Sequence, residues 1–230
     1  IMGNAEISML DCEDEEIRQT LEIILEQTIR GRNLTKNLVA FAKDQEPKQE
    51  FFNINDKIHL AISLLKKDLD SIRVRTDLEK NIPPLLADPG MIEHSLINLI
   101  QNSIHATSKV EKAIITIKTY HLDQKICIEI QDNGCGIPKK HHDSIYTPAF
   151  TLKGSNDISS SYKKNIKGTG YGMSNVKMYI EKHHGEISFV SGKEKGTIFL
   201  IQLPIRQEGL TDEEILEVQR NEIQTHKQIL

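Results

Sequence analysis

Two asparagines in the run INLIQNSIHA, Asn98 and Asn102, have side chains that could bind a metal ion. They are four residues apart, so on a helix they lie on one face. An amide oxygen is a neutral ligand suited to Mg²⁺, which takes most of its remaining ligands from water and substrate phosphates. His105 follows three residues after Asn102 and could reach a phosphate if it were protonated. Exposed helix amides and a surface histidine would give the same pattern, so these residues alone do not establish a site.

The run QDNGCGIP directly follows a predicted strand, which puts Asp132 at the strand's carboxyl end on a glycine-rich turn. A buried carboxylate at such a place could accept a hydrogen bond from the amino group of adenine. Gly134 and Gly136 would let the backbone approach the base. DNG is also a common hairpin turn. The residues that follow it look like a loop and a short helix, which favours a binding site over a hairpin.

A second glycine-rich run, KGTGYGMSNV, opens a predicted helix, where free backbone N–H groups and the helix dipole could hold phosphate. It lacks the GxxxxGKS/T spacing of a P-loop and does not follow a first strand, as a dinucleotide-binding fingerprint does. Its glycines resemble the start of a protein-kinase glycine loop, but the chain has no HRD or DFG run. Lys153 and Lys167 flank the polar stretch before it. They are candidates for phosphate contacts or for a solvated lysine surface.

The sequence pattern of the first part of the chain predicts helices. From Ile17 to Phe41, apolar residues recur at three- and four-residue spacing, which predicts a long amphipathic helix over 17–43. The acidic residues 11–16 suit a loop that enters its N-terminus. Residues 1–10 are then predicted to end a preceding antiparallel helix, and a polar linker follows at 44–50. Such a segment suits a two-helix hairpin or a dimer bundle.

After the linker the pattern changes to mixed helix and strand. Asn55 is predicted to cap the first helix of this region, and Asp88, followed by Pro89, the second. The HLDQ run is predicted to join two strands with alternating isoleucines. Residues 153–167 are predicted to form a mobile loop. The predicted strands are 51–55, 71–78, 113–120, 125–132 and a last hairpin over 186–204. The predicted helices are 55–71, 88–109, 171–185, which would close at Gly185, and a charged stretch over 209–230.

The composition is that of an ordinary globular protein, since 38% of the 230 residues are hydrophobic and 27% are charged. No apolar run is long enough to span a bilayer, so we expect no membrane contact within the chain. The formal net charge of -4 gives no reason to expect nucleic-acid binding. Three separated cysteines without a CxxC motif argue against disulfides and zinc, and they fit a cytoplasmic location. Because Ile1 lies inside a helical pattern, we expect a fragment of a longer protein, which could carry a membrane anchor.

Five motifs in order resemble the ATP-binding domain of sensor histidine kinases, a member of the GHKL superfamily. NLIQN, DNGCG, IYTPAFTLK, GTGYG and GTIFLIQLP resemble its N, G1, F, G2 and C-terminal glycine boxes. The resemblance covers residues 51–204 directly. In addition, residues 1–10 resemble the stretch just after the phosphoacceptor motif, and the helix at 17–43 resembles the second helix of the dimerisation hairpin.

The resemblance implies ATP and Mg²⁺ as cofactors, with Asn102 as the metal ligand and Asn98 and His105 beside it at the catalytic position. Residues 148–167 would be the ATP lid. His105 and Ala106 depart from the pattern, because many family members have a lysine and an aromatic residue there. The implied nucleotide contacts are Asp132, Gly134, Gly136, Ile137, Lys153, Lys167, Gly168, Thr169, Gly170, Tyr171, Gly172, Met173 and Thr197, with Asp132 reading the adenine and Thr197 completing the base pocket.

The family implies an α+β fold, a two-layer α/β sandwich in which helices back a mixed sheet in the Bergerat-type arrangement, here preceded by a long α-helical hairpin segment. We expect a truncated dimerisation segment at 1–46, an ATP-binding catalytic domain at 47–206 and a helical linker at 207–230. KQIL at the end resembles the first strand of a response-regulator receiver domain, so that linker could lead to one.

The family's reaction passes the γ-phosphoryl group of ATP to a histidine and then to an aspartate of a response-regulator receiver domain. The family's acceptor histidine is followed by Glu or Asp, and none of the nine histidines has that setting on the predicted hairpin. We therefore expect the acceptor histidine to precede Ile1. We also expect that the chain forms a homodimer through its N-terminal helices and that it does not phosphorylate itself.

Three alternatives compete with a histidine kinase. GHKL-type ATPases need a carboxylate to activate water, four residues before the metal-binding asparagine, where this chain has Asn98. Serine-phosphorylating anti-sigma kinases lack the N-terminal helical hairpin. A nucleotide-binding regulatory scaffold without kinase activity is disfavoured by the intact glycines and Asn102.

Overall fold

The computed structural model describes residues 2–10, 12, 14–42, 46–157, 160–163, 166–192 and 195–205. The helical stretch predicted at 209–230, and with it the expected linker 207–230, lies outside these residues. The chain divides into two compact units, residues 1–44 and 45–230. Among the described residues, no helix is both long enough and apolar enough to cross a membrane.

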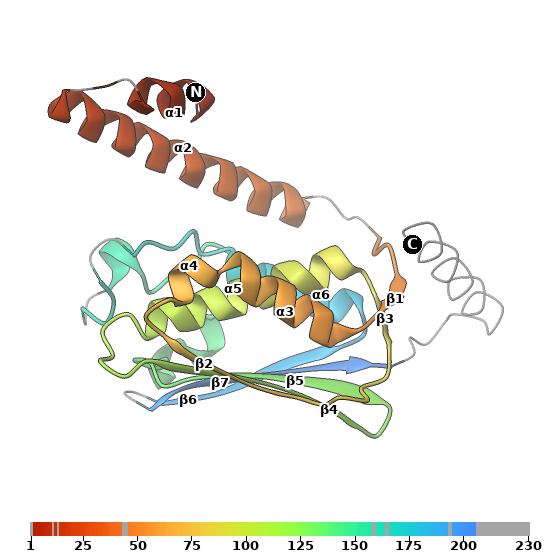
Figure 1. Cartoon of the computed structure of the whole chain (residues 1–230). Helices are drawn as coiled ribbons and strands as arrows, with labels where there is room; N and C mark the ends of the chain where they lie inside the picture. The colour runs from red at the N-terminus through yellow and green to blue at the C-terminus, as the bar shows by residue number, and fades with distance from the viewer. Residues whose placement is uncertain are drawn as a thin grey trace. The chain divides into compact units, whose positions relative to one another are not determined.

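The first unit consists of two helices, α1 (Met2–Leu10) and α2 (Glu15–Ala42), which lie side by side and antiparallel (Figure 1). Asp14 caps α2, because its Oδ1 accepts the N–H groups of Glu16 at 2.9 Å and Ile17 at 3.2 Å. Ile7 on α1 and Ile23 on α2 are 63% and 58% exposed. Within this unit, apolar side chains therefore remain available to a partner surface.

The second unit is built on a five-stranded mixed sheet of order β2-β4-β5-β7-β6. Its strands are β2 (Arg73–Leu78), β4 (Ile114–Leu122), β5 (Lys125–Asp132), β6 (Glu186–Gly192) and β7 (Gly196–Pro204). Only the β2–β4 pair is parallel. Asp123 and Gln124 form the tight turn between β4 and β5, with positive φ angles of 51° and 56°.

Helices cover one face of this sheet (Figure 1). They are α3 (Ile54–Leu64), α4 (Lys66–Leu69), α5 (Pro89–Ala106) and α6 (Gly172–Lys182), with short 3-10 turns at η1 (Lys139–Ser144) and η2 (Gly154–Asn156). Ile115 and Ile117 of β4 are fully buried in one core with Leu96 and Leu99 of α5. The strand alternation thus puts one row of side chains under the helices, and the predicted α+β sandwich is confirmed.

The start of the second unit differs from the sequence prediction. Strand β1 (Glu50–Phe52) ends earlier than expected, and Asn53 rather than Asn55 caps α3, since its side chain accepts the N–H of Asn55 at 2.9 Å. Asn55 instead donates from its side-chain amide to the carbonyl of Glu79 at 2.8 Å. Strand β3 (Leu85–Ala87), which pairs antiparallel with β1, was not predicted because three buried residues show no periodicity.

A buried histidine joins the ends of two helices. His183, just after α6, has no exposed surface, and its Nε2 accepts the N–H of Asp88 at 2.9 Å. Asp88 caps α5 as predicted, through a 2.9 Å hydrogen bond from the N–H of Met91. The helix predicted to close at Gly185 ends at Lys182 instead, and a positive φ of 53° follows at His184. Gly185 is needed for space, because a Cβ there would lie 2.7 Å from the Gln202 carbonyl oxygen.

Candidate functional site

The polar face of α5 forms one end of the candidate site. Asn102 accepts a hydrogen bond from the Lys153 ammonium, with 2.6 Å between Oδ1 and Nζ, and its amide nitrogen lies 3.2 Å from the sulfur of Met173. Asn98 is one turn earlier and donates to the carbonyl of His94 at 3.0 Å. The structure therefore brings Lys153 and Met173, which are 51 and 71 residues away in sequence, onto Asn102.

His105 does not carry the positive charge that it would need to attract a phosphate. Its Nδ1 lies 2.9 Å from the Lys153 ammonium. Because an ammonium group can only donate, Nδ1 accepts, and the ring is neutral. Burial, together with the neighbouring Lys153 charge, lowers the pKa of His105 to about 3. The cation near Asn102 at neutral pH is therefore Lys153, although burial lowers the pKa of its ammonium to about 8.

Asp132 forms the other end of the site at the carboxyl end of β5. It is 3% exposed, and its two carboxylate oxygens accept the N–H of Gly134 at 2.8 Å and the hydroxyl of Ser103 at 3.2 Å. Burial raises the pKa of Asp132 to about 6, and these hydrogen bonds partly oppose that rise. The ionised carboxylate retains lone pairs that could accept from a base. Sequence reasoning missed Ser103, although a small polar residue beside Asn102 on a buried helix face was a usable signal.

The turn after β5 is held tightly against its neighbours. A Cβ on Gly134 would lie 2.6 Å from the backbone of Ala106, and one on Gly136, which has φ of 70°, would overlap the carbonyl of Gly192. Gly136 therefore lets this turn approach the end of β6, and its approach to the base stays a prediction. The N–H of Ile137 donates to the Ser191 hydroxyl at 2.8 Å.

Thr197 lies on β7 directly opposite Asp132 in the strand register. It is 3% exposed, and its hydroxyl is 2.9 Å from that of Ser191. Asp132 and Thr197 are thus neighbours fixed by sheet pairing, although they are 65 positions apart in sequence.

The glycine-rich run before α6 closes against two other segments. Gly170 has φ of 79°, and a Cβ on it would overlap the backbone of Ala149. A Cβ on Gly172, the first residue of α6, would lie 2.9 Å from Oδ1 of Asn98. Gly168 and Thr169 are exposed, and the Thr169 hydroxyl accepts the N–H of Tyr171 at 3.4 Å. These packing constraints put the start of α6, with its outward-facing N–H groups, beside α5.

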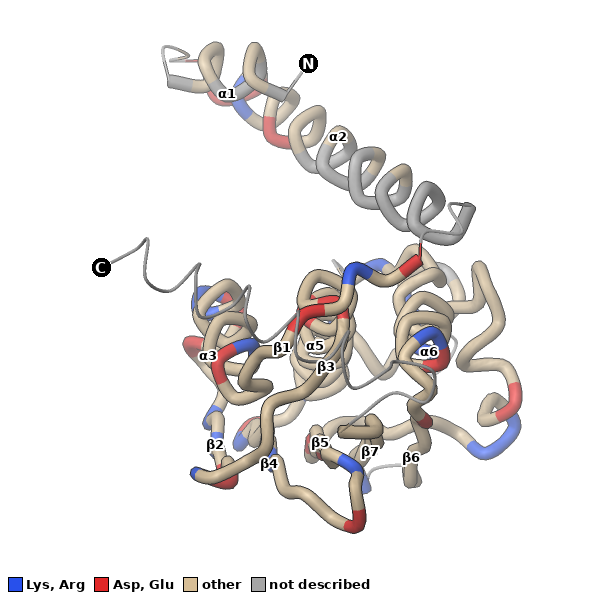
Figure 2. The backbone as a smooth tube through the Cα atoms, turned by 90° about the vertical axis from the view of Figure 1, so that its right-hand side faces the viewer, with Lys and Arg blue, Asp and Glu red and all other residues tan. Residues whose placement is uncertain are grey.

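Positive charge at this end comes from individual side chains. Figure 2 shows acidic and basic residues interspersed along the part of the second unit that the structure describes. Lys153 reaches Asn102, whereas Lys167 is exposed and lies against Gly154. A Cβ on Gly168, which follows Lys167, would lie 3.3 Å from the Lys153 side chain, so the segments that carry the two lysines are neighbours, although only Lys153 contacts Asn102 among the described contacts.

The residues at this end fit a magnesium ion bound with phosphate. No cluster of three or more His, Cys, Asp or Glu side chains among the described residues would hold a metal by itself. The amide oxygen of Asn102 already accepts from a cation in this structure, the Lys153 ammonium. A single neutral oxygen suits an ion that takes its other ligands from phosphate and water.

The comparisons with known proteins agree with this geometry. A family model described as histidine kinase-, DNA gyrase B-, and HSP90-like ATPase matches residues 87–207. The sensor histidine kinase ZraS of Salmonella typhi is 28% identical over 192 residues, which are 83% of this chain and 38% of ZraS. The sensory histidine kinase/phosphatase NtrB of Salmonella typhimurium is 28% identical over 224 residues, 90% of this chain and 58% of NtrB.

Solved structures show the same fold. The catalytic domain of histidine kinase ThkA is 26% identical, with a TM-score of 0.56, over 68% of this chain and 95% of that domain. ThkA in complex with the response regulator protein TrrA matches at 21% identity with a TM-score of 0.67, over 91% of this chain and 58% of that one. The chain spans 38% to 58% of the length of ZraS and NtrB.

Proposed function

Because the chain belongs to the histidine kinase-, DNA gyrase B- and HSP90-like ATPase family, we propose that its ATP-binding site is the catalytic core of a protein-histidine kinase. In this proposal Mg·ATP donates its γ-phosphoryl group to a histidine, for relay to an aspartate of a response regulator. The family match supports ATP binding, and the resemblance to ZraS, NtrB and ThkA supports the kinase class. The single observation that carries the assignment is the convergence of Asn102, Lys153 and the start of α6 opposite buried Asp132.

The residues have separate roles in this proposal. Asp132 accepts a hydrogen bond from the adenine amino group, and Thr197 borders the base. Asn102 holds Mg²⁺, which neutralises phosphate charge when it is bound. The backbone N–H groups around Gly170 and Gly172 bind phosphate oxygens, and the Lys153 ammonium adds a positive charge beside them. Phosphoryl transfer asks mainly for positioning and charge stabilisation, which is what these side chains offer.

Asn98 favours transfer over hydrolysis. Its side-chain amide is bound to the carbonyl of His94 and has no basic group. It cannot take a proton from water, as a carboxylate would. A GHKL-type ATPase is therefore the second candidate and not the first.

The remaining parts of the proposal concern the segments beside the site. Neither α1 nor α2 contains a histidine, so the phosphoryl acceptor is proposed to lie on another segment. Homodimerisation is proposed through these helices, supported by the exposed Ile7, Ile17 and Ile23. The response-regulator partner is proposed from the resemblance to ThkA, whose complex with TrrA is known. A cytoplasmic location is proposed, supported by ATP as the substrate and by the free cysteines Cys12, Cys127 and Cys135.

The test is to incubate the chain with Mg²⁺ and ATP labelled on the γ-phosphate. We expect saturable ATP binding, no repeated release of inorganic phosphate and no acid-labile phosphate on the chain. Multiple-turnover phosphate release would favour the ATPase, and stable acid-labile labelling would show an acceptor histidine within residues 1–230. Failure of the chain to bind ATP would show that the proposed nucleotide site is wrong.

A further inference from the structure

Residues 160–163 lie against the carboxyl end of α5. The Lys109 ammonium donates to the carbonyl of Ser160, and the N–H of Lys163 donates to the Ser108 hydroxyl at 3.4 Å. Ser108 and Lys109 come just after Thr107, the residue that caps the carboxyl end of α5. The two contacts flank Tyr162 on both sides, so its backbone is held over this end of the helix.

Tyr162 is itself fixed at both ends. Its N–H donates to a carboxylate oxygen of Asp157 at 2.8 Å. Its hydroxyl shares a hydrogen bond with the thiol of Cys135, and the side chain is half-buried. Burial and the contact with Cys135 raise the pKa of the Tyr162 hydroxyl, so the phenol is neutral. The ring is thus positioned before any ligand is present, which limits the entropy lost on binding.

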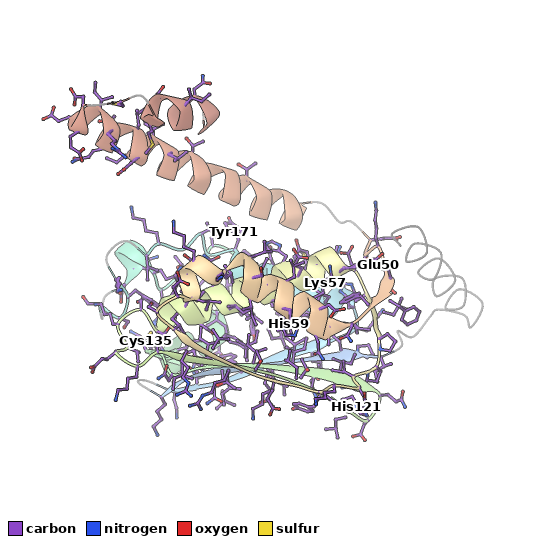
Figure 3. The ribbon with its side chains drawn as sticks, in the orientation of Figure 1. Glu50, Lys57, His59, His121, Cys135 and Tyr171 are labelled. Atoms are coloured by element: carbon purple, nitrogen blue, oxygen red, sulfur yellow. The ribbon has the colours of Figure 1, made fainter. Side chains whose placement is uncertain are left out.

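Cys135 connects this ring to the base end of the site. It lies three residues after Asp132, in the turn after β5, and its N–H donates to the Ala106 carbonyl at 3.1 Å. Figure 3 shows Cys135 at the end of the sheet where β5 stops, opposite the end marked by His121. Asp132, Cys135 and Tyr162 are therefore contributed by neighbouring segments around the carboxyl end of α5. Ala106, which faces the same turn through Gly134, has a side chain too small to cover a flat ligand.

We propose that Tyr162 covers the adenine base. This binding residue belongs neither to the sheet nor to α5 but to the segment that follows residue 153. The inference rests on the proposed nucleotide site and deepens it. Asp132 hydrogen-bonds the edge of the base, and the Tyr162 ring supplies the apolar surface on its face. The Cys135 thiol holds the phenol in place, because a hydroxyl bonded at a fixed point leaves the ring little freedom to rotate away.

The test compares Tyr162→Ala with Tyr162→Phe and with Lys163→Ala as the matched control. Lys163 is the exposed neighbour whose backbone, not side chain, contacts Ser108. Binding of adenosine and of Mg-free ADP is measured by calorimetry, since neither ligand depends on the metal. Aromatic contact with a base is worth about 1–3 kcal/mol by alanine substitution, so Tyr162→Ala should weaken both ligands roughly tenfold. Tyr162→Phe should lose less than about threefold, because it keeps the ring and loses one hydrogen bond.

The outcomes separate this proposal from the proposed function. If wild-type protein binds neither adenosine nor ADP, the nucleotide site is wrong. If wild-type protein binds and Tyr162→Ala binds equally well, Tyr162 does not cover the base. Tighter binding by Tyr162→Ala would also overturn the proposal, because the ring would then block the pocket. A thermal unfolding curve close to that of wild type, together with normal Lys163→Ala binding, excludes misfolding as the cause of a loss.

Discussion

The two ends of the nucleotide site are built in different ways. At the base end, Asp132 and Thr197 are each 3% exposed and are fixed by the pairing of β5 with β7. At the phosphate end, Gly168 and Thr169 are exposed, and the only cation on Asn102 among the described contacts comes from Lys153, outside the regular helices and strands. The proposed base end is therefore part of the folded core, whereas the proposed phosphate end combines α5 and the start of α6 with residues from loops. Substitutions at the base end should act on every adenine ligand, and substitutions at the phosphate end only on phosphorylated ones.

The largest expected effect is at the base end. Asp132→Asn replaces a charged acceptor with a neutral amide, which can keep its contacts with the Gly134 N–H and the Ser103 hydroxyl but no longer offers the base a charged oxygen. Losing a charged hydrogen bond costs about 1.5–3 kcal/mol, so affinity for ADP should fall by up to about 100-fold, with and without Mg²⁺. Calorimetric titration measures the ADP affinity, and Asp77→Asn, at an exposed position of β2, is the control. A loss seen only with Mg²⁺ would contradict the assignment.

The same substitution should not destabilise the fold at neutral pH. Because the folded-state pKa of Asp132 is raised from 3.8 to about 6, this carboxyl stabilises the protein below pH 3.8, and that contribution is lost as the pH rises through 6. At pH 7 the buried charge therefore opposes folding. Urea unfolding of Asp132→Asn at pH 7 should give an unchanged or larger free energy of unfolding.

The second-largest expected effect concerns the proposed Mg²⁺ ligand. Asn102→Ala removes the proposed Mg²⁺ ligand, so affinity for ATP should fall by about 20-fold in the presence of Mg²⁺, the size expected for one lost interaction with a charged group. Affinity for Mg-free ADP should stay within about twofold. Asn98→Ala is the matched comparison, because its amide bonds a backbone carbonyl, and it should weaken Mg·ATP less. Equal losses with and without Mg²⁺ would show that Asn102 is not the ligand.

Adenosine affinity should depend on pH, and among the polar groups described at the site only the titration of Asp132 should cause this dependence. His105 has a pKa of about 3 and stays neutral, and adenosine has no phosphate to titrate. As pH falls from 7 to 5, protonation of Asp132 around its pKa of about 6 should weaken adenosine roughly tenfold. Asp132→Asn should abolish this dependence. A wild-type affinity that is constant between pH 7 and 5 would mean that the ionised carboxylate does not bind the base.

The smallest effect tests the lysine. Lys153→Met removes the ammonium but keeps a long side chain, so ATP affinity should fall by about fivefold, as for one partly screened charge contact, while adenosine affinity stays unchanged. Lys167→Met should change ATP affinity less than twofold, because Lys167 is exposed and lies against Gly154. A larger loss of ATP affinity in Lys167→Met than in Lys153→Met would mean that Lys167, and not Lys153, contacts the phosphates.

Local patterns predicted much of this molecule. The spacing of Asn98 and Asn102, the cap and proline that start α5, and the turn between β4 and β5 all depend on neighbours in sequence. The glycines of the two turns were found in the same way, although the close approach of Gly136 to Gly192 was not foreseen.

Contacts between distant residues were not predictable from the sequence. The neutral state of His105 depends on Lys153, 48 residues away, and on burial. The anchoring of His183 on Asp88 and the placement of Tyr162 on Cys135 likewise need the three-dimensional arrangement. Strand β3 shows a related limit, because its three residues are stabilised by pairing with β1 and not by a local pattern.

The most direct measurement is a calorimetric titration of ATP into the wild-type chain, with and without Mg²⁺, repeated with Asp132→Asn. We predict one site per chain, tighter binding when Mg²⁺ is present, and a loss in Asp132→Asn that is the same in both conditions. Absence of saturable binding, or binding that Asp132→Asn leaves unchanged, would contradict a nucleotide site between the end of β5 and the start of α6.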